Sequence, residues 1–258
     1  MHPVLFKIGK FTSYTYGLLL GIAIITALLI SYDRAKKRNM DADAIIDIGI
    51  WGIIGGFIGA KLLYILSVAP EIVKNPSMLW ENLTSGFVLY GGIIGGCVGA
   101  DIYCRKKKLS FWKYFDLAAP AIAVAQGIGR IGCLMAGCCY GKETTCPIGI
   151  TFKESFSAPN GVRLHPTQIY SSMGDFIIAL ILFSFAKKER KDGQVSGLYM
   201  ILYSIGRFLI EFLRDDPRGN IGIFSTSQFI CIFVLISGII IYNKDKIKTT
   251  TPPSKDTI

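Results

Sequence analysis

Long apolar stretches alternate with short polar segments along nearly the whole chain. Seven such stretches can be distinguished, at residues 14–32, 44–68, 86–104, 114–136, 167–186, 195–213 and 224–242. A helix needs about 20 apolar residues to cross the hydrocarbon core of a bilayer. The runs are continuous rather than alternating, which favours helices over the strands of a barrel. The pattern therefore predicts an all-α, polytopic membrane protein with seven transmembrane helices.

The fourth apolar stretch differs from the others because small and cyclic residues interrupt it. Pro120 and glycines 127, 129 and 132 all fall within residues 114–136. Interruptions at membrane depth are tolerated where the backbone is buried in protein or lines a cavity. This stretch is therefore a candidate for a functional site.

The loops between the stretches alternate in charge. Basic residues gather in the segments 34–38, 105–108 and 187–191 and in the lysines of the tail, whereas the intervening loops contain few. Basic loops face the cytoplasm in membrane proteins. The alternation predicts an N-terminus outside, a C-terminus in the cytoplasm, one seven-span membrane domain over residues 1–258, and a flexible cytoplasmic tail at 243–258.

Composition agrees with a membrane protein. The chain has 258 residues, of which 51% are hydrophobic and 18% charged, and its mean hydropathy is +0.46. The net charge of +10 could suggest a nucleic-acid partner. Because the basic residues lie in short loops beside the apolar stretches, we interpret them as a topology signal with affinity for anionic lipid head groups, and expect no nucleic-acid binding.

Two glycine-rich segments resemble each other, GIIGGFIGA at 52–60 and GIIGGCVGA at 92–100. Glycines at this spacing let two membrane helices approach closely. Close packing of the second and third spans is the favoured interpretation, and a duplicated ancestral unit is the alternative.

Few ionisable residues lie inside the apolar stretches, and such residues usually mark functional sites. In the sixth stretch and at its end, Tyr203, Arg207, Glu211 and Arg214 follow helical spacing and fall on one face. Glu211 can pair with Arg207 and reach Arg214, which leaves that face positive. Arg130 adds an intramembrane arginine with no carboxylate nearby in the sequence. Arginines on two helices predict a clamp for the phosphate of a lipid head group, and a purely structural ion pair is the alternative.

The segment HPTQIY at 165–170 opens the fifth stretch from the outer side. His165 and His2 are the only histidines of the chain. His165 is thus a candidate general base, with a helix-capping or interfacial role as the alternative. The proline that follows it suits the start of a helix.

Seven cysteines lie at positions 97, 104, 133, 138, 139, 146 and 231. None forms the C-x2-C unit that is typical of a structural zinc site, so we expect no metal. A redox pair is possible, with Cys138 or Cys139 bonding to Cys146, and tight packing beside glycine is the alternative.

Together these segments resemble the prolipoprotein diacylglyceryl transferase family over nearly the full length. The matching pieces are YGLLLGI at 16–22, GRIG at 129–132 with the glycine at 141, HPTQIY at 165–170 and YSIGRFLIEFLRDDPRG at 203–219. The resemblance implies a seven-span enzyme of the bacterial inner membrane. Such an enzyme transfers the diacylglyceryl group of phosphatidylglycerol to the lipobox cysteine of a prolipoprotein signal peptide, forms a thioether and releases glycerol phosphate. The nucleophile is a substrate thiol, and no cofactor is implied.

The resemblance also implies roles for individual residues. Arg130 and Arg207 match the two essential arginines of the family. The implied phosphatidylglycerol-binding residues are Arg130, Arg207, Arg214, Tyr16, Tyr203 and Gly141. The implied catalytic residues are Arg207, Glu211, Tyr90 and His165, of which Tyr90 or His165 would assist deprotonation of the incoming thiol.

Several positions depart from the pattern of the family. Cys133, Ala136 and Cys138 replace two asparagines and a glutamate, and Tyr90 stands where relatives carry a histidine. Ser171 stands in the place of a glutamate, and Lys61 in that of an arginine. These changes keep the arginines but remove acid–base groups. They motivate two alternative functions: a paralogue that binds or transports an anionic phospholipid without transfer, and a thiol oxidoreductase built on Cys138 and Cys139.

Overall fold

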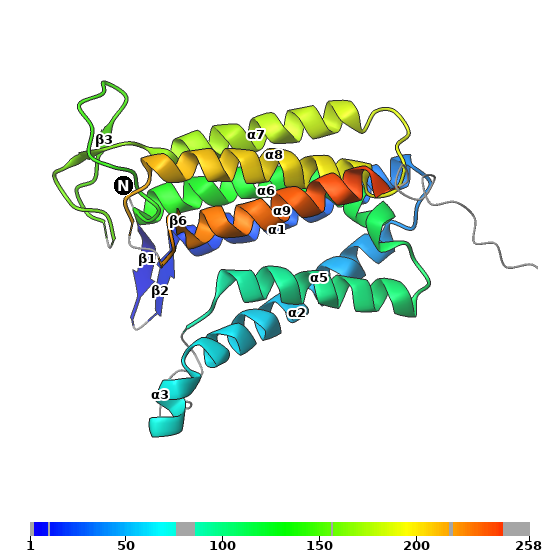
Figure 1. The fold of residues 1–258 in the computed structure, drawn as a ribbon, viewed down its shortest axis with the longest axis horizontal. Helices are drawn as coiled ribbons and strands as arrows, with labels where there is room; N and C mark the ends of the chain where they lie inside the picture. Colours follow the sequence, from blue (N-terminus) through cyan, green and yellow to red (C-terminus); the bar gives the residue numbers. More distant parts are fainter. Residues whose placement is uncertain (1–2, 10, 76–85, 156, 217–218, 245–258) are drawn as a thin grey trace, which may run out of the picture. The chain divides into compact units, whose positions relative to one another are not determined.

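The computed structural model of the protein describes residues 3–9, 11–75, 86–155, 157–216 and 219–244 (Figure 1). The chain divides into two compact units. The first comprises Met1–Ile30 and Phe115–Ile258, and the second comprises Ser31–Tyr114. The predicted tail at 243–258 lies outside the described residues from position 245 onward.

Each predicted apolar stretch coincides with a helix. The helices are α1 (Thr15–Lys37), α2 (Asp43–Ser67), α5 (Leu89–Lys106), α6 (Phe111–Ala136), α7 (Thr167–Phe185), α8 (Gln194–Ile210) and α9 (Thr226–Tyr242). A short helix α3 (Ala69–Lys74) follows α2, and a 3₁₀ turn (Glu211–Leu213) extends α8. By length and composition, five described helices can cross a membrane, namely α1, α2, α6, α7 and α8 with its extension. An all-helical, multi-pass architecture is therefore confirmed, while the count of seven spans and their orientation stay predictions.

Short antiparallel hairpins join the helices of the first unit. β1 (Val4–Ile8) pairs with β2 (Phe11–Tyr14), β3 (Ile150–Thr151) with β4 (Arg163–Leu164), and β5 (Asn220–Ile221) with β6 (Phe224–Ser225). Figure 1 shows these hairpins at the same end of the helices of this unit. The loops that precede α1, α7 and α9 are thus gathered at one end.

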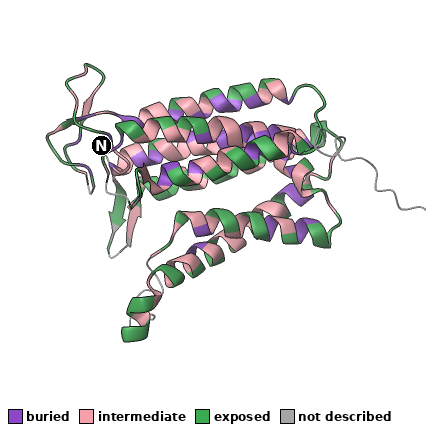
Figure 2. Ribbon diagram, viewed as in Figure 1, coloured by how far each residue is buried: buried purple, intermediate pink, exposed green. Residues whose placement is uncertain are grey.

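The core of the first unit forms where α6, α7 and α8 pack together. Small residues on α6, such as Ala119 and Ala123, are fully buried against Leu182 of α7 and Val195 of α8. Figure 2 shows exposed positions along the helices. Many of the exposed side chains are large and apolar. Leu180, for example, is 67% exposed. This distribution suits a protein whose surroundings are lipid rather than water.

Helix α6 runs unbroken from Phe111 to Ala136, through Pro120 and the glycines that were expected to interrupt it. Two of these glycines make room for neighbouring aromatic rings. A Cβ at Gly127 would lie 2.8 Å from the Phe176 ring, and one at Gly132 would lie 3.2 Å from the Tyr16 ring. The glycines of α6 therefore serve close packing without ending the helix.

In the second unit, α2 and α5 approach each other glycine to glycine. A Cβ at Gly55 or Gly95 would collide with the backbone of the opposite glycine, and the same holds for Gly59 and Gly91. The predicted close packing of the two similar segments is confirmed. A hydrogen bond of 2.5 Å, donated by the Tyr103 hydroxyl to Asp47 Oδ2, joins the same two helices.

Candidate active site

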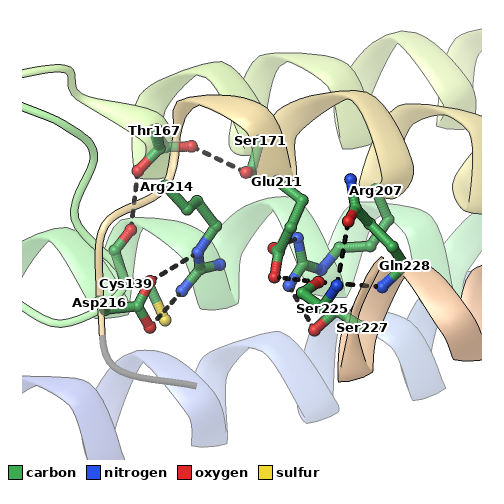
Figure 3. Close-up of polar contacts among 10 residues, drawn as sticks. All are labelled: Cys139, Thr167, Ser171, Arg207, Glu211, Arg214, Asp216, Ser225, Ser227 and Gln228. Atoms are coloured by element: carbon green, nitrogen blue, oxygen red, sulfur yellow. Dashed lines mark hydrogen bonds and ion pairs between the residues drawn. The ribbon is translucent and has the colours of Figure 1, made fainter. Parts of the chain in front are cut away.

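Helices α8 and α9 are joined by polar side chains at the end where the hairpins gather (Figure 3). Arg207 donates to Glu211 Oε2 at 2.5 Å and to Ser227 Oγ at 2.9 Å. The Ser225 hydroxyl, which also caps α9, donates to Glu211 Oε1 at 2.7 Å. The predicted pairing of Arg207 with Glu211 is confirmed. Both side chains are less than a tenth exposed, so the pair is held in place on several sides.

A hollow of about 290 Å³ opens beside this pair in the first unit. Its polar lining comes from three helices and comprises Arg130, Tyr170, Ser171, Asp175, Tyr203 and Arg207. The structure thus brings both predicted arginines to one cavity, Arg130 from α6 and Arg207 from α8.

The two arginines differ in their partners. Arg207 is bonded to Glu211 and Ser227, whereas no described side chain forms a hydrogen bond or ion pair with Arg130. A guanidinium cannot lose its proton and presents a planar array of donors suited to phosphate oxygens. Arg130 is therefore the cation of the hollow that is available to an incoming anion.

Asp175 on α7 was not among the residues predicted from the sequence. It is 6% exposed and lines the hollow, and its Oδ2 atom has no hydrogen-bond partner among the described residues. An acidic residue in an apolar stretch, one turn beyond Ser171, was the signal that could have revealed it. The carboxylates of Asp175 and Glu211 equal in number the guanidiniums of Arg130 and Arg207, so the site has no excess of positive charge. Anion binding is therefore supported by Arg130, which forms no ion pair with a described residue.

Arg214 does not continue the helical face of Arg207 and Glu211, so the expected reach of Glu211 to Arg214 was wrong. Helix α8 ends at Ile210, and the 3₁₀ turn after it leads into extended backbone at Arg214. The guanidinium instead donates to Asp216 through two bonds of 2.8 and 2.9 Å and faces the Cys139 thiol (Figure 3). Burial opposes its charge, but these hydrogen bonds raise the pKa of Arg214.

Gly141 holds the loop after α6 against the ends of two other helices. Its N–H donates to the His165 carbonyl at 3.2 Å, and the N–H of Lys142 donates to the Leu213 carbonyl at 2.8 Å. A Cβ at Gly141 would lie 2.6 Å from the His165 carbonyl oxygen and 2.8 Å from that of Leu213. Only glycine fits this approach, so Gly141 positions the backbone around the site.

The remaining predicted residues lie at different distances from the hollow. Tyr203 lines it and stacks on Tyr199, with ring centroids 5.9 Å apart. His165 reaches it through Tyr170, whose hydroxyl lies 3.3 Å from His165 Nδ1. Tyr16 lines a different hollow, at the start of α1. Tyr90 begins α5 in the second unit, so its predicted part in catalysis stays a prediction.

None of the seven cysteines forms a disulfide, and three of them converge. The sulfurs of Cys133, Cys138 and Cys139 lie within 4.8 Å of one another, whereas Cys146 lies outside this group. Hydrogen bonds from the thiols of Cys133 and Cys138, helped by the charge of Arg214, lower the pKa of Cys139. Hydrogen bonds among the same thiols raise the pKa of Cys138.

Many known proteins are similar in sequence to this chain. The family model described as prolipoprotein diacylglyceryl transferase matches residues 3–243. The phosphatidylglycerol–prolipoprotein diacylglyceryl transferase of Clostridium tetani is 48% identical over 96% of this chain and 99% of its own length. The second such enzyme of Clostridium perfringens is 46% identical over 96% of this chain and 97% of its own length, and that of Finegoldia magna is 35% identical over 96% and 99%. The chain therefore belongs to the prolipoprotein diacylglyceryl transferase family.

Proposed function

We propose that this protein transfers the diacylglyceryl group of phosphatidylglycerol to the cysteine thiol of a prolipoprotein. The carbon–sulfur bond of a thioether forms as the carbon–oxygen bond to glycerol phosphate breaks. The observation that carries the proposal is Arg130, a guanidinium without a described partner, facing one hollow with Arg207 and Asp175. The shared reaction of the named relatives, at 46–48% identity over nearly the whole chain, supports it.

In this proposal the two arginines have different tasks. Arg130 binds the phosphate of the lipid directly. Arg207 is held by Glu211 and Ser227, so its donors stay oriented toward the charge that builds on the departing glycerol phosphate. Donors that are fixed before the reaction contribute most where charge develops. Tyr203 completes the wall of the hollow, and Gly141 and Arg214 fix the loops around it.

The proton of the incoming thiol needs an acceptor, because a thiol is only a few per cent ionised at neutral pH. Asp175 is the carboxylate that lines the same hollow, with one oxygen unbonded among the described residues. His165 is joined to the hollow through Tyr170, and Tyr90 belongs to the second unit. We assign the acceptor role to Asp175, with His165 acting through Tyr170 as the next candidate.

The location and orientation of the enzyme belong to the same proposal. The basic loops face the cytoplasm, seven helices span the bacterial inner membrane, and the N-terminus lies outside. The hollow then opens toward the outer leaflet, where the signal peptide of a prolipoprotein meets phosphatidylglycerol.

The proposal is tested with purified protein, phosphatidylglycerol carrying a radiolabelled diacylglyceryl group, and a peptide that contains a lipobox cysteine. Wild-type protein should label the peptide, and Arg130→Ala should lower the rate by about 100-fold or more, as expected for loss of a phosphate donor. Arg190→Ala removes an exposed arginine outside the hollow and is the matched control. No labelling by wild-type protein, or equal rates for the two variants, would contradict the proposal.

A further inference from the structure

The thiols of Cys133, Cys138 and Cys139 form a cluster that the proposed transfer does not use. They come from the last turn of α6 and from the loop that follows it. Their three sulfur atoms all lie within 4.8 Å of one another. In a tetrahedral zinc site the metal–sulfur distance is about 2.3 Å, which separates the ligand sulfurs by somewhat less than 4 Å. A small contraction of the cluster would therefore place one metal ion in contact with all three.

The backbone that carries the thiols is fixed by its neighbours. Thr167 Oγ1 donates to the Cys139 carbonyl at 2.7 Å, and Gln168 Nε2 donates to the Cys138 carbonyl at 2.7 Å. The N–H of Cys138 donates to the Cys133 carbonyl at 3.1 Å. Two buried side chains of α7 thus hold the loop from one side. A site whose ligands are held in advance binds a metal with little loss of conformational entropy.

The backbone of Cys139 adopts a strained conformation, so the loop must be held in place by its contacts. Its φ is +62°, in the left-handed region, and only two other described non-glycine residues, Asn39 and Lys108, share a positive φ. Such a conformation is strained for a side chain that lacks special compensation. The bonds from Thr167 and Gln168 supply that compensation, and the result is that adjacent cysteines both join the cluster.

Charge around the cluster suits a metal bound by thiolates. A divalent ion with three thiolates carries a net charge of −1. The Arg214 guanidinium faces Cys139 and is 3% exposed, so it can balance that charge. Among the described residues no fourth cysteine, histidine, aspartate or glutamate joins the group. Three protein ligands and one open position are typical of zinc sites that act on a bound ligand rather than of closed structural sites.

We propose that Cys133, Cys138 and Cys139 bind a thiophilic divalent metal ion of the Zn²⁺ type, with the fourth position open to the thiol of a substrate. Cys138 lines a hollow of about 320 Å³ together with Tyr14, Tyr16 and Gly17, which gives such a ligand room to enter. Soft thiolate ligands select zinc over magnesium or calcium.

The substrate part of the inference rests on the proposed transfer reaction. As the substrate sulfur bonds to the metal, its S–H bond breaks and the proton passes to Asp175, the acceptor assigned in the proposed transfer. No electrons are exchanged with an outside reagent. The metal holds the substrate as a thiolate, which is the nucleophilic form of a thiol. The cluster would in this way activate the substrate thiol for the proposed transfer.

The experiment uses the full-length protein in detergent, freed of metal under reducing conditions and titrated with Co²⁺ and then Zn²⁺. Wild-type protein should bind one Co²⁺ per chain with thiolate-to-cobalt charge-transfer absorption, and Zn²⁺ should displace it. Cys138→Ser should weaken Co²⁺ binding by more than about 10- to 100-fold, the loss expected for even an outer partner of a metal site. Cys146→Ser, which changes a free thiol outside the cluster, should leave binding unchanged.

A lipobox peptide should strengthen the charge-transfer absorption of the cobalt form, and the same peptide with serine in place of cysteine should not. Absent cobalt binding by wild-type protein would overturn the metal site whether or not the variants fold. A disulfide between Cys133 and Cys138 in freshly purified protein, found by mass spectrometry, would overturn it in favour of a redox pair. An unchanged spectrum with the cysteine peptide would overturn the substrate position alone. None of these results depends on the transfer assay. Failure of the metal site can therefore be distinguished from failure of the proposed function.

Discussion

Two helix pairs of the molecule, α8 with α9 and α2 with α5, both pack closely through glycine but differ in the polar side chains that join them. Both use glycine: a Cβ at Gly197 would lie 2.9 Å from the Gly238 carbonyl oxygen, and Gly95 meets Gly55 even more closely. The α8–α9 pair adds the buried bond from Arg207 to Ser227, whereas α2 and α5 add a bond from Tyr103 to an exposed Asp47. Glycine brings the helices together in both pairs, and among the described residues of the two pairs only α8 and α9 are joined by a buried charged side chain.

Removing the buried cation of α8 should have the largest effect. Arg207→Ala should lower the transfer rate by about 100- to 1000-fold, because it removes donors aimed at developing charge. It also leaves Glu211 buried without its cation, which costs about 3–5 kcal/mol of folding stability. Both losses are measured on one preparation, by labelled transfer and by thermal unfolding. A variant with nearly normal activity would show that the ion pair only joins the helices.

Adding a methyl group between α2 and α5 should affect stability rather than chemistry. Gly95→Ala should destabilise the protein by about 1–3 kcal/mol, because the new Cβ meets backbone atoms of α2 that cannot move aside. The rate per folded molecule should change little. Gly21→Ala on α1, where a Cβ meets nothing within 4 Å, is the matched control and should be neutral or slightly stabilising. Equal unfolding temperatures for the two variants would refute the glycine contact.

Loss of a single hydrogen bond at the α8–α9 contact should have a smaller effect on the transfer rate and on stability. Ser227→Ala removes the acceptor of one Arg207 bond, and bonds to charged groups are worth about 1.5–3 kcal/mol. The transfer rate should fall about tenfold, with the unfolding temperature also lowered. Ser204→Ala tests the specificity, because the Ser204 hydroxyl is buried yet bonds only to carbonyls of its own helix among the described residues. If Ser204→Ala lowered the rate as much, orientation of Arg207 would not be the cause.

The smallest effect is expected at the polar contact between α2 and α5. Tyr103→Phe removes the bond to Asp47, which stays exposed and can bind water instead. The free energy of unfolding should fall by about 1 kcal/mol, the usual net value of one hydrogen bond. Transfer per folded molecule should be unchanged. A rate loss comparable with that of Ser227→Ala would mean that the second unit acts on the reaction as directly as the first.

The helices were predictable from the sequence because long apolar runs leave few other structures in a membrane. The pairing of Arg207 with Glu211 followed from helical spacing, because residues four apart lie one helical turn from each other. Arg214 did not follow, because the chain leaves the helix after Ile210 and a tertiary partner, Asp216, takes its side chain. Helical periodicity carries no information about where a helix ends in the last turn.

Contacts between segments that are distant in the sequence could not be predicted from the spacing of residues. Asp175 joins the arginines only because α7 packs beside α6 and α8, and Cys133 meets Cys139 only because the loop after α6 turns back through a left-handed residue. Because the sequence has no C-x2-C units, motif spacing predicted no metal site. The folded chain brings thiols of different spacing into one cluster, since side-chain convergence depends on the turn and not on sequence distance alone.

The bond from Arg207 to Ser227 also sets the order in which the enzyme can mature during synthesis. Ser227 lies near the start of α9, the last described helix, so Arg207 gains this partner only after that helix has been made and has folded back. Until then Glu211 is the only one of the two described partners of Arg207 that is available to it. A nascent chain released before α9 would thus carry both arginines in its sequence, yet it would lack the finished geometry of the site.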